Sequence, residues 1–327
     1  MELQKSLFQH VKGQLSSQLS LVDEVAELLQ ISNDSAYRRI RGEKELTFSE
    51  LGILSKHFRF SVDTFLGLGK NSFVFRGSLI DGKKTSLKDY LHSMLLVVMN
   101  GSNHPEVRLY MEAKDILPFH HFIIPELAAF KLFFWSKTLF REDASPKKFL
   151  PENYEPELVR LAEEVSRTYV KLQATEIWST ETLNSSLRQV NYLWHSGYLS
   201  GKAQALHLFD RMGEMIDHLE EEVAAGEKFL PGSSPTGNTS NFELYYNDVL
   251  LGHNTILTVL NESMQIFMNH NVLNFMRSTD ENLCRYTFET FQNIMRKSNC
   301  ISVNNEKDRV RFFNDMRNMI AAEMKNL

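Results

Sequence analysis

The sequence predicts a mainly α protein, and three observations lead to that fold class. Short helical segments with clear start signals fill residues 1–69, and longer amphipathic segments follow as far as residue 228. Alternation with a period of two residues, which is typical of strands, is confined to residues 107–113 and to the stretch after residue 241. Hydrophobic residues make up 43% of the 327 positions and charged residues 24%, as in ordinary globular proteins. Length and pattern together indicate three segments, at 1–69, 70–230 and 242–327.

The N-terminal segment, 1–69, is expected to form a five-helix domain. Apolar residues recur at helical spacing over the first 15 positions, which predicts the first helix. Hydroxyl side chains suited to capping free amides precede four further helices, and they are Ser20, Ser32, Thr47 and Ser61. Gly42 is placed to end the third helix, since glycine is favoured just after a helix C-terminus. Each helix is too short to be stable alone, so the five must pack on one another.

The central segment, 70–230, is expected to be an antiparallel helical block with one isolated strand at 107–113. The predicted helices cover residues 87–99, 125–140, 157–174, 182–195 and 202–225. Short loops join the last three, as in antiparallel helical hairpins. The most apolar stretch, 122–140, contains Glu126, Lys131 and Lys137 and therefore indicates a buried helix rather than a membrane span.

The C-terminal segment is expected to be a small α+β module. Residues 231–241, PGSSPTGNTSN, consist of turn-forming types and predict a linker. Three period-two stretches follow, FELYYND, NTILTVL and MQIFMNH, with a hairpin turn at residues 261–263. They predict a short antiparallel sheet, and two helices at 281–297 and 307–325 complete the module.

Residues 25–42 carry the pattern that points to function. The small side chain of Ala26 permits a close helix crossing, Ile31 and Ser32 form a tight turn, and a second helix begins after the serine. Ala36 and Ile40 lie four residues apart and are expected on the buried face of that helix. The opposite face is polar and short, which suits the major groove of DNA.

Residues 20–66 resemble the Cro/C1-type helix-turn-helix domain of many small bacterial and phage repressors. The residues that carry the resemblance are Val25, Ala26, Leu29, Ile31, Ser32, Arg41, Gly42, Leu51, Leu54, Phe58, Ser61, Val62, Asp63 and Leu66. The chain departs from the family at two points. Gln30 stands where the family usually has glycine, and Arg39 stands where the second buried residue of the recognition helix falls, so Ile40 is expected to take that role.

The resemblance implies a transcriptional regulator that reads double-stranded operator DNA. The expected DNA-contacting residues are Asn33, Asp34, Ser35, Tyr37, Arg38, Arg39, Arg41 and Lys44. Arg41 and Lys44 follow the helix and suit phosphate contacts, which position a protein without reading sequence. One short helix buries little surface, so a homodimer on two half-sites is expected, with the C-terminal segments providing dimerisation or the sensing of a small-molecule or protein effector.

The charge balance is compatible with that expectation. The formal net charge is −5, from 36 basic and 41 acidic side chains, which argues against indiscriminate coating of DNA. Six basic residues nevertheless fall within positions 38–59, namely Arg38, Arg39, Arg41, Lys44, Lys56 and Arg59. The alternative hypothesis is a protein-interaction scaffold in which the helix-turn-helix serves only as a packing unit.

Other candidate sites carry weaker patterns. His120 and His121 are adjacent and lack acidic or cysteine partners at ligand spacing, so structural histidines are expected rather than a metal site. We likewise interpret three further groups as structural or solvated: His253 and His270, the aromatic residues of 130–140, and the acidic run 220–222. The basic cluster of Arg296, Lys297, Arg309 and Arg311 has the same interpretation. Phosphate-loop, hydrolase and zincin motifs do not occur in the sequence, so we expect no enzyme, no cofactor and no metal. A third hypothesis, after the regulator and the scaffold, is an enzyme formed by residues 242–327.

The remaining expectations concern the compartment. Cys284 and Cys300 are the only cysteines, without ligand or disulfide spacing, and are expected to be reduced thiols. The first residues contain no apolar run of the kind a signal peptide needs. A cytoplasmic protein without a membrane segment is therefore expected.

Overall fold

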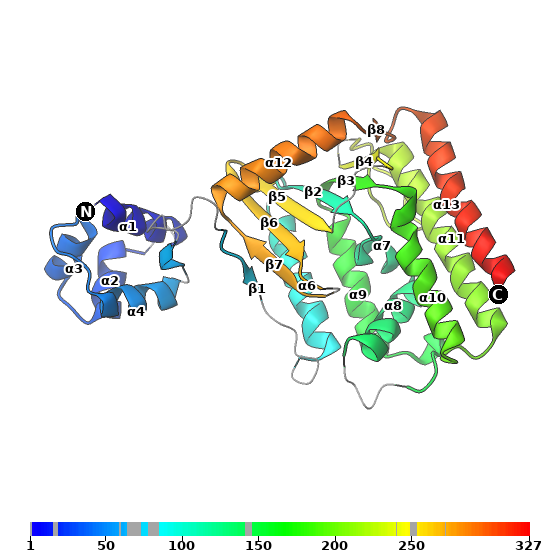
Figure 1. The fold of residues 1–327 in the computed structure, drawn as a ribbon, viewed down its shortest axis with the longest axis horizontal. Helices are drawn as coiled ribbons and strands as arrows, with labels where there is room; N and C mark the ends of the chain where they lie inside the picture. The colour runs from blue at the N-terminus through cyan, green and yellow to red at the C-terminus, as the bar shows by residue number, and fades with distance from the viewer. Residues whose placement is uncertain are drawn as a thin grey trace. The chain divides into compact units, whose positions relative to one another are not determined.

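The computed structural model describes residues 2–15, 19–58, 60–63, 73–77, 85–140, 146–239, 241–248, 254–271 and 273–327 (Figure 1). Residue contacts divide the chain into two compact units, Met1–Val74 and Phe75–Leu327. Among the described residues, none of the helices combines the length and the apolar character that crossing a membrane requires.

The first unit consists of short packed helices, as predicted. They are α1 (Glu2–Gln14), α2 (Leu21–Leu29), α3 (Asn33–Ile40) and α4 (Phe48–Phe58). The Ser20 hydroxyl accepts a hydrogen bond from the amide of Asp23, and the Ser32 hydroxyl accepts one from the amide of Ser35. A separate core centred on Phe8, Val25 and Leu54 joins the helices. The fifth helix was expected after Ser61, and most of it, with Leu66, lies outside the described residues.

The second unit is built on one mixed sheet of eight described strands. They are β1 (Arg76–Gly77), β2 (Arg108–Ala113), β3 (Gln173–Trp178), β4 (Phe242–Tyr246), β5 (Thr255–Leu260), β6 (Ser263–Asn269), β7 (Phe275–Ser278) and β8 (Asn299–Cys300). Their order across the sheet is β1-β7-β6-β5-β2-β3-β4-β8. The central strands β2, β3 and β4 are parallel, and the other pairs are antiparallel.

Helices cover both faces of this sheet (Figure 1). They are α6 (Leu87–Ser102), α7 (Pro118–His121), α8 (Pro125–Thr138), α9 (Pro156–Tyr169), α10 (Asn184–His195), α11 (Lys202–Ala225), α12 (Glu281–Arg296) and α13 (Glu306–Asn326), with two 3₁₀ turns at Pro151–Asn153 and Thr180–Leu183. The main core holds side chains of β2, β3 and β4 together with those of α6–α11 and α13. A smaller core on the other face holds Ile177, Leu257 and Ile266 against Cys284 and Phe291 of α12.

The fold class expected from the sequence is therefore wrong for the second unit. The expected short antiparallel sheet is instead a large mixed sheet, and strands from both 70–230 and 242–327 belong to it. Four strands escaped prediction. β1 and β8 span two residues each, too few for any pattern. The first two residues of β3 fall inside the helix predicted at 157–174, and its sequence, QATEIW, does not alternate between apolar and polar residues. β7 spans only four residues, too few for a period-two pattern to be recognised.

Several local predictions are confirmed. The strand expected at 107–113 is β2, although it is not isolated as expected but pairs with β3 and β5. The helix expected at 202–225 is α11 with the same bounds. The predicted hairpin is the antiparallel β5–β6 pair, in which Asn261 adopts a left-handed conformation with a φ of 53°. The aromatic side chains of α8 lie in the main core, as expected.

Candidate functional site

Small side chains of α2 and α3 lie in the core that joins the two helices. Ala26 of α2 is 6% exposed and Ala36 of α3 is fully buried. Val25 is also fully buried, and Leu29, Ile31 and Ile40 pack at the edge of the same core. This is the buried face expected from the sequence, and it directs the opposite face of α3 to solvent.

Each of the two helices is followed by a residue in the left-handed conformation. At the end of α2, Gln30 has a φ of 54°, and the Ile31 amide donates to the Ala26 carbonyl at 3.0 Å. At the end of α3, Gly42 has a φ of 77°, and the Glu43 amide donates to the Arg38 carbonyl at 2.8 Å. Glycine is favoured at such positions because a Cβ atom crowds the backbone. Gln30 carries a Cβ atom, so its left-handed conformation is strained.

The exposed face of α3 carries most of the residues expected to contact DNA. Six of the eight are exposed, and they are Asn33, Asp34, Tyr37, Arg38, Arg41 and Lys44; Ser35 is half-buried. The guanidinium of Arg41 lies 5.5 Å from the centre of the Tyr37 ring, and its Nε lies 3.3 Å from a carboxylate oxygen of Glu43. Asn33 already donates to the carboxylate of Asp23 at 2.9 Å. The exposed cationic side chains, Arg38, Arg41 and Lys44, lie in the C-terminal half of the helix and just beyond its end.

Arg39 lies on the other side of α3, among buried residues. It is 4% exposed, and its Nη2 and Nε donate to the two carboxylate oxygens of Glu50 at 2.6 and 3.2 Å. Its Nη1 donates to the Ser35 carbonyl at 3.0 Å. Hydrogen bonding from Arg39 lowers the pKa of Glu50, which also accepts from the Thr47 amide at 2.9 Å. Arg39 thus occupies the buried position that the sequence assigned to Ile40, and its charge holds α3 to α4.

Gln4 of α1 fastens the loop that follows α3. Its Nε2 donates to the carbonyls of Arg39 and Lys44 at 2.6 and 2.8 Å, and its Oε1 accepts from the Leu46 amide at 3.1 Å. Lys44 is consequently held at a defined place beside the exposed face of α3.

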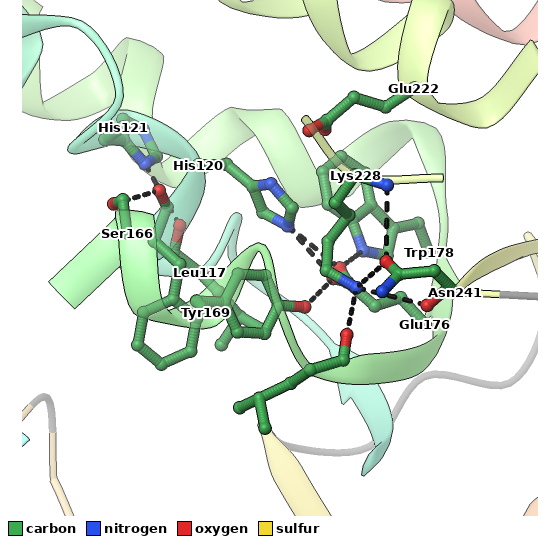
Figure 2. Close-up of polar contacts among 12 residues, drawn as sticks. Leu117, His120, His121, Ser166, Tyr169, Glu176, Trp178, Glu222, Lys228 and Asn241 are labelled. Carbon is green, nitrogen blue, oxygen red and sulfur yellow. Dashed lines mark hydrogen bonds and ion pairs between the residues drawn. The ribbon is translucent and has the colours of Figure 1, made fainter. Parts of the chain in front are cut away.

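The second unit contains a buried polar cluster that sequence reasoning missed (Figure 2). The carboxylate of Glu176 on β3 accepts hydrogen bonds from Tyr169 at 2.5 Å and from Trp178 Nε1 at 2.7 Å, and His120 Nε2 lies 3.0 Å away. Burial by itself raises the pKa of Glu176, but its partners outweigh that effect and the net shift is downward. The pKa of Tyr169 is raised well above its usual value by burial and by this carboxylate. The sequence offered only a weak signal, the acidic residue Glu176 directly before the apolar Ile177 and Trp178.

Lys228 and Glu222 complete the cluster beside β4. Lys228 Nζ donates to the Leu172 carbonyl at 2.6 Å and to Asn241 Oδ1 at 3.0 Å, and burial lowers its pKa to about 8. Glu222 is 2% exposed, which corrects the expectation that the whole acidic run 220–222 is solvated. One of its oxygens accepts from the Phe229 amide, and the other has no hydrogen-bond partner among the described residues.

A neighbouring buried group joins His121, Ser186 and Lys131. His121 Nε2 and Lys131 Nζ lie 2.8 and 3.0 Å from the Ser186 hydroxyl, and Lys131 also donates to Gln189 at 2.7 Å. Burial lowers the pKa of Lys131 to about 7 and the pKa of His121 well below its usual value. Ser186 and His121 are at most 1% exposed, so this hydroxyl is out of reach of a substrate in solution. Both histidines are buried and lie within hydrogen-bonding distance of protein groups.

The other candidate residues have structural or solvated positions. Arg309 is buried and donates to the carbonyls of Ile301 and Asn304, whereas Arg296, Lys297 and Arg311 are exposed. His253 lies outside the described residues. Within the described ranges, no group of three or more His, Cys, Asp or Glu side chains is arranged to hold a metal ion. The exposed face of α3 is therefore the candidate functional site.

Comparison of the chain with models of protein families, with characterised proteins and with solved structures found no significant match.

Proposed function

We propose that this protein is a sequence-specific DNA-binding transcriptional regulator that reads the major groove with α3. The observation that carries the proposal is the α2–turn–α3 geometry. The core that α3 shares with α2 buries one side of this eight-residue helix and leaves its other side polar, cationic and exposed. A helix of this size and character fits the major groove, where arginine can make two hydrogen bonds to guanine.

The exposed side chains divide into two roles. Arg38 and Tyr37 project from the helix itself and would meet base edges, together with Asn33, Asp34 and Ser35 at its start. Arg41 and Lys44 follow the helix and would contact phosphates, with Gln4 holding the loop in place. Arg39 would act from the protein interior by positioning α3, because its guanidinium is committed to Glu50.

The proposal extends to the assembly and the compartment. A single short helix supports limited specificity, so the protein would act as a homodimer on an operator with two half-sites. The second unit would supply dimerisation, the sensing of a small-molecule or protein effector, or both. The cell compartment would be the cytoplasm, in keeping with the free thiols of Cys284 and Cys300. No catalytic step forms part of the proposal.

The direct test is selection of binding sites from random DNA with the full-length chain. We expect one enriched sequence with two related half-sites. The variant Arg38→Ala with Arg41→Ala should weaken binding to that DNA by at least about 30-fold, since each arginine contact contributes roughly 1–3 kcal/mol. Lys56→Ala, an exposed cation on α4, is the matched control and should bind within a few-fold of the unchanged chain.

Salt dependence separates a phosphate contact from a base contact. The slope of log affinity against log salt concentration becomes shallower by about 0.9 for each phosphate that the protein no longer neutralises. Lys44→Ala should lose one phosphate contact and show this change in slope. A selection that enriches no sequence would overturn the proposal and favour the alternative, a protein-interaction scaffold. Unchanged binding by the Arg38 and Arg41 double variant would overturn the assignment of α3 as the reading helix.

A further inference from the structure

Helix α3 contains three charged side chains, and two of them have no partner within the part of the chain that the structure describes. Arg39 is the engaged one, since its guanidinium is held by Glu50. Asp34 and Arg38 are both exposed, and neither side chain makes a hydrogen bond or an ion pair with another described residue. One carboxylate and one guanidinium of α3 are therefore available to a ligand.

The polar side chains beside them are engaged within the protein. Asn33 Nδ2 donates to the carboxylate of Asp23 at 2.9 Å. The guanidinium of Arg41 lies over the Tyr37 ring, and its Nε lies 3.3 Å from a carboxylate oxygen of Glu43. The two unpartnered charges thus stand out from the rest of the exposed face.

Asp34 and Arg38 lie on one face of α3. They are four residues apart, which places them about 6 Å apart along the helix axis and on the same side of it. Ala36 stands midway between them and is fully buried, so the face that carries both charges is turned away from the core. Opposite charges at this spacing on a helix surface attract each other only weakly, so both side chains remain available to DNA.

A carboxylate on a face that reads DNA restricts the sequences that can bind. It accepts hydrogen bonds and donates none, and it is repelled by the phosphates. The donors in the major groove are the amino groups of cytosine and adenine. The adenine amino group lies between two acceptors, N7 of the same base and O4 of the paired thymine, whereas the cytosine amino group has one such neighbour, O6 of the paired guanine. Cytosine is therefore the base that suits a carboxylate best, and guanine the base that suits an arginine.

We propose that Asp34 selects a cytosine in the operator, within two base pairs of a guanine that Arg38 contacts. The inference rests on the proposed function and names the bases that its reading helix distinguishes. The limit on the spacing follows because about 6 Å along α3 is less than the rise of two base pairs, about 6.8 Å. The charge of Asp34 weakens binding to all DNA, and a cytosine at this position offsets that effect, so Asp34 determines specificity through rejection of the other bases.

A purely structural role for Asp34 gives a different expectation. The residue stands in the first turn of α3, where the helix dipole favours a negative charge. Ser32 already caps this turn, because its hydroxyl accepts from the Ser35 amide at 3.3 Å. If Asp34 served the helix alone, its replacement would change the stability of α3 and leave the preferred DNA sequence unchanged.

Selection from random DNA with full-length variants tests the base assignment. The sequence enriched by the unchanged chain should contain one cytosine whose replacement weakens binding by at least about fivefold, as a mismatched base does. Asp34→Asn should change that single position to adenine, because an amide makes two hydrogen bonds to adenine N6 and N7. Asp34→Ala should lose the cytosine preference without gaining adenine. Fluorescence anisotropy with four duplexes that differ only at this position measures each preference directly.

Two further variants serve as control and as a test of the spacing. Glu27→Gln removes an exposed carboxylate from α2 and should leave every base preference unchanged. Arg38→Ala should relax the preference for a guanine no more than two base pairs from the cytosine. Hydrogen exchange of peptides from α3 shows whether each variant retains the folded helix.

Failure of this inference and failure of the proposed function give different results. An enriched sequence that Asp34→Asn leaves unchanged at every position would overturn the inference and leave the proposed function standing. The same conclusion would follow if Glu27→Gln caused the same change of base, or if the guanine lay farther than two base pairs from the cytosine. A selection in which the unchanged chain enriches no sequence would overturn the proposed function, and this inference with it.

Discussion

Replacing Arg39 by alanine should destabilise the first unit strongly, although the residue lies on the proposed reading helix. The substitution removes three hydrogen bonds of the guanidinium, two to Glu50 and one to the Ser35 carbonyl. Removing one member of a buried ion pair typically costs 3–5 kcal/mol, because the other charge stays desolvated. The Glu50 side chain is 16% exposed and keeps its bond to the Thr47 amide, so water and backbone offset part of that cost. We therefore expect a loss of about 2–4 kcal/mol.

The assay must report on the first unit alone. All three tryptophans, Trp135, Trp178 and Trp194, belong to the second unit, so tryptophan fluorescence does not follow unfolding of the first. Hydrogen exchange of peptides from α2, α3 and α4 in the full-length chain measures the local free energy of opening. Tryptophan fluorescence then serves as an internal control, and its unfolding transition should be unchanged.

Two comparisons isolate the ion pair. Arg38→Ala alters an exposed arginine on the same helix and should change the opening free energy by no more than about 0.5 kcal/mol. Arg39→Leu combined with Glu50→Gln replaces the pair by an apolar residue and a neutral capping residue, and should recover most of the loss. A loss below about 1 kcal/mol for Arg39→Ala, or an equal loss for Arg38→Ala, would refute the reasoning.

The pH dependence has a defined direction. Because Arg39 lowers the pKa of Glu50 below its ordinary value of 4.5, this carboxylate contributes its full stabilisation above pH 4.5. The contribution is lost as the pH falls through the lowered pKa of the folded state. The difference between the unchanged chain and Arg39→Ala should therefore shrink below pH 4.5, and a difference that persists at low pH would mean that packing rather than charge carries the effect.

Three further substitutions have clear expected outcomes. Gln30→Gly should stabilise the first unit by about 0.5–1 kcal/mol in the same hydrogen-exchange assay, because it removes the strain of a non-glycine residue in the left-handed conformation. An equal gain for Gln30→Ala would contradict this cause. Glu176→Gln should destabilise the second unit by about 3 kcal/mol, measured by urea unfolding with tryptophan fluorescence. The glutamine amide cannot accept hydrogen bonds from every donor that surrounds the Glu176 carboxylate. A loss below about 1 kcal/mol would show that these hydrogen bonds contribute little to stability. Lys131→Met should raise the stability of that unit by about 1–3 kcal/mol. The pKa of Lys131 is about 7 in the folded protein and 10.5 ordinarily, so the gain in stability should be largest below pH 7 and disappear toward pH 10.5. A gain that does not change with pH would show that it does not come from removing the buried charge.

The helix-turn-helix could be predicted from the sequence because its signals are local. Serine caps, a small residue in α2 and a glycine after α3 all act within about four residues of the bonds they form. The same holds for α11 and for the β5–β6 hairpin, whose turn lies between the two strands. The buried position of Arg39 depended on Glu50, eleven residues away on another helix, and no local pattern indicated it.

By itself, the sequence determined where short helices begin and end, and which side of α3 is polar. Only the tertiary structure decided that one mixed sheet unites the second unit, since β3 pairs with β2 across 65 residues and with β4 across nearly 70. Such pairings are made by backbone groups that every residue carries, so they leave no local mark in the sequence. The burial of Glu176 followed from the same pairing, because its three partners, His120, Tyr169 and Trp178, converge on it only once β3 lies at the centre of the sheet.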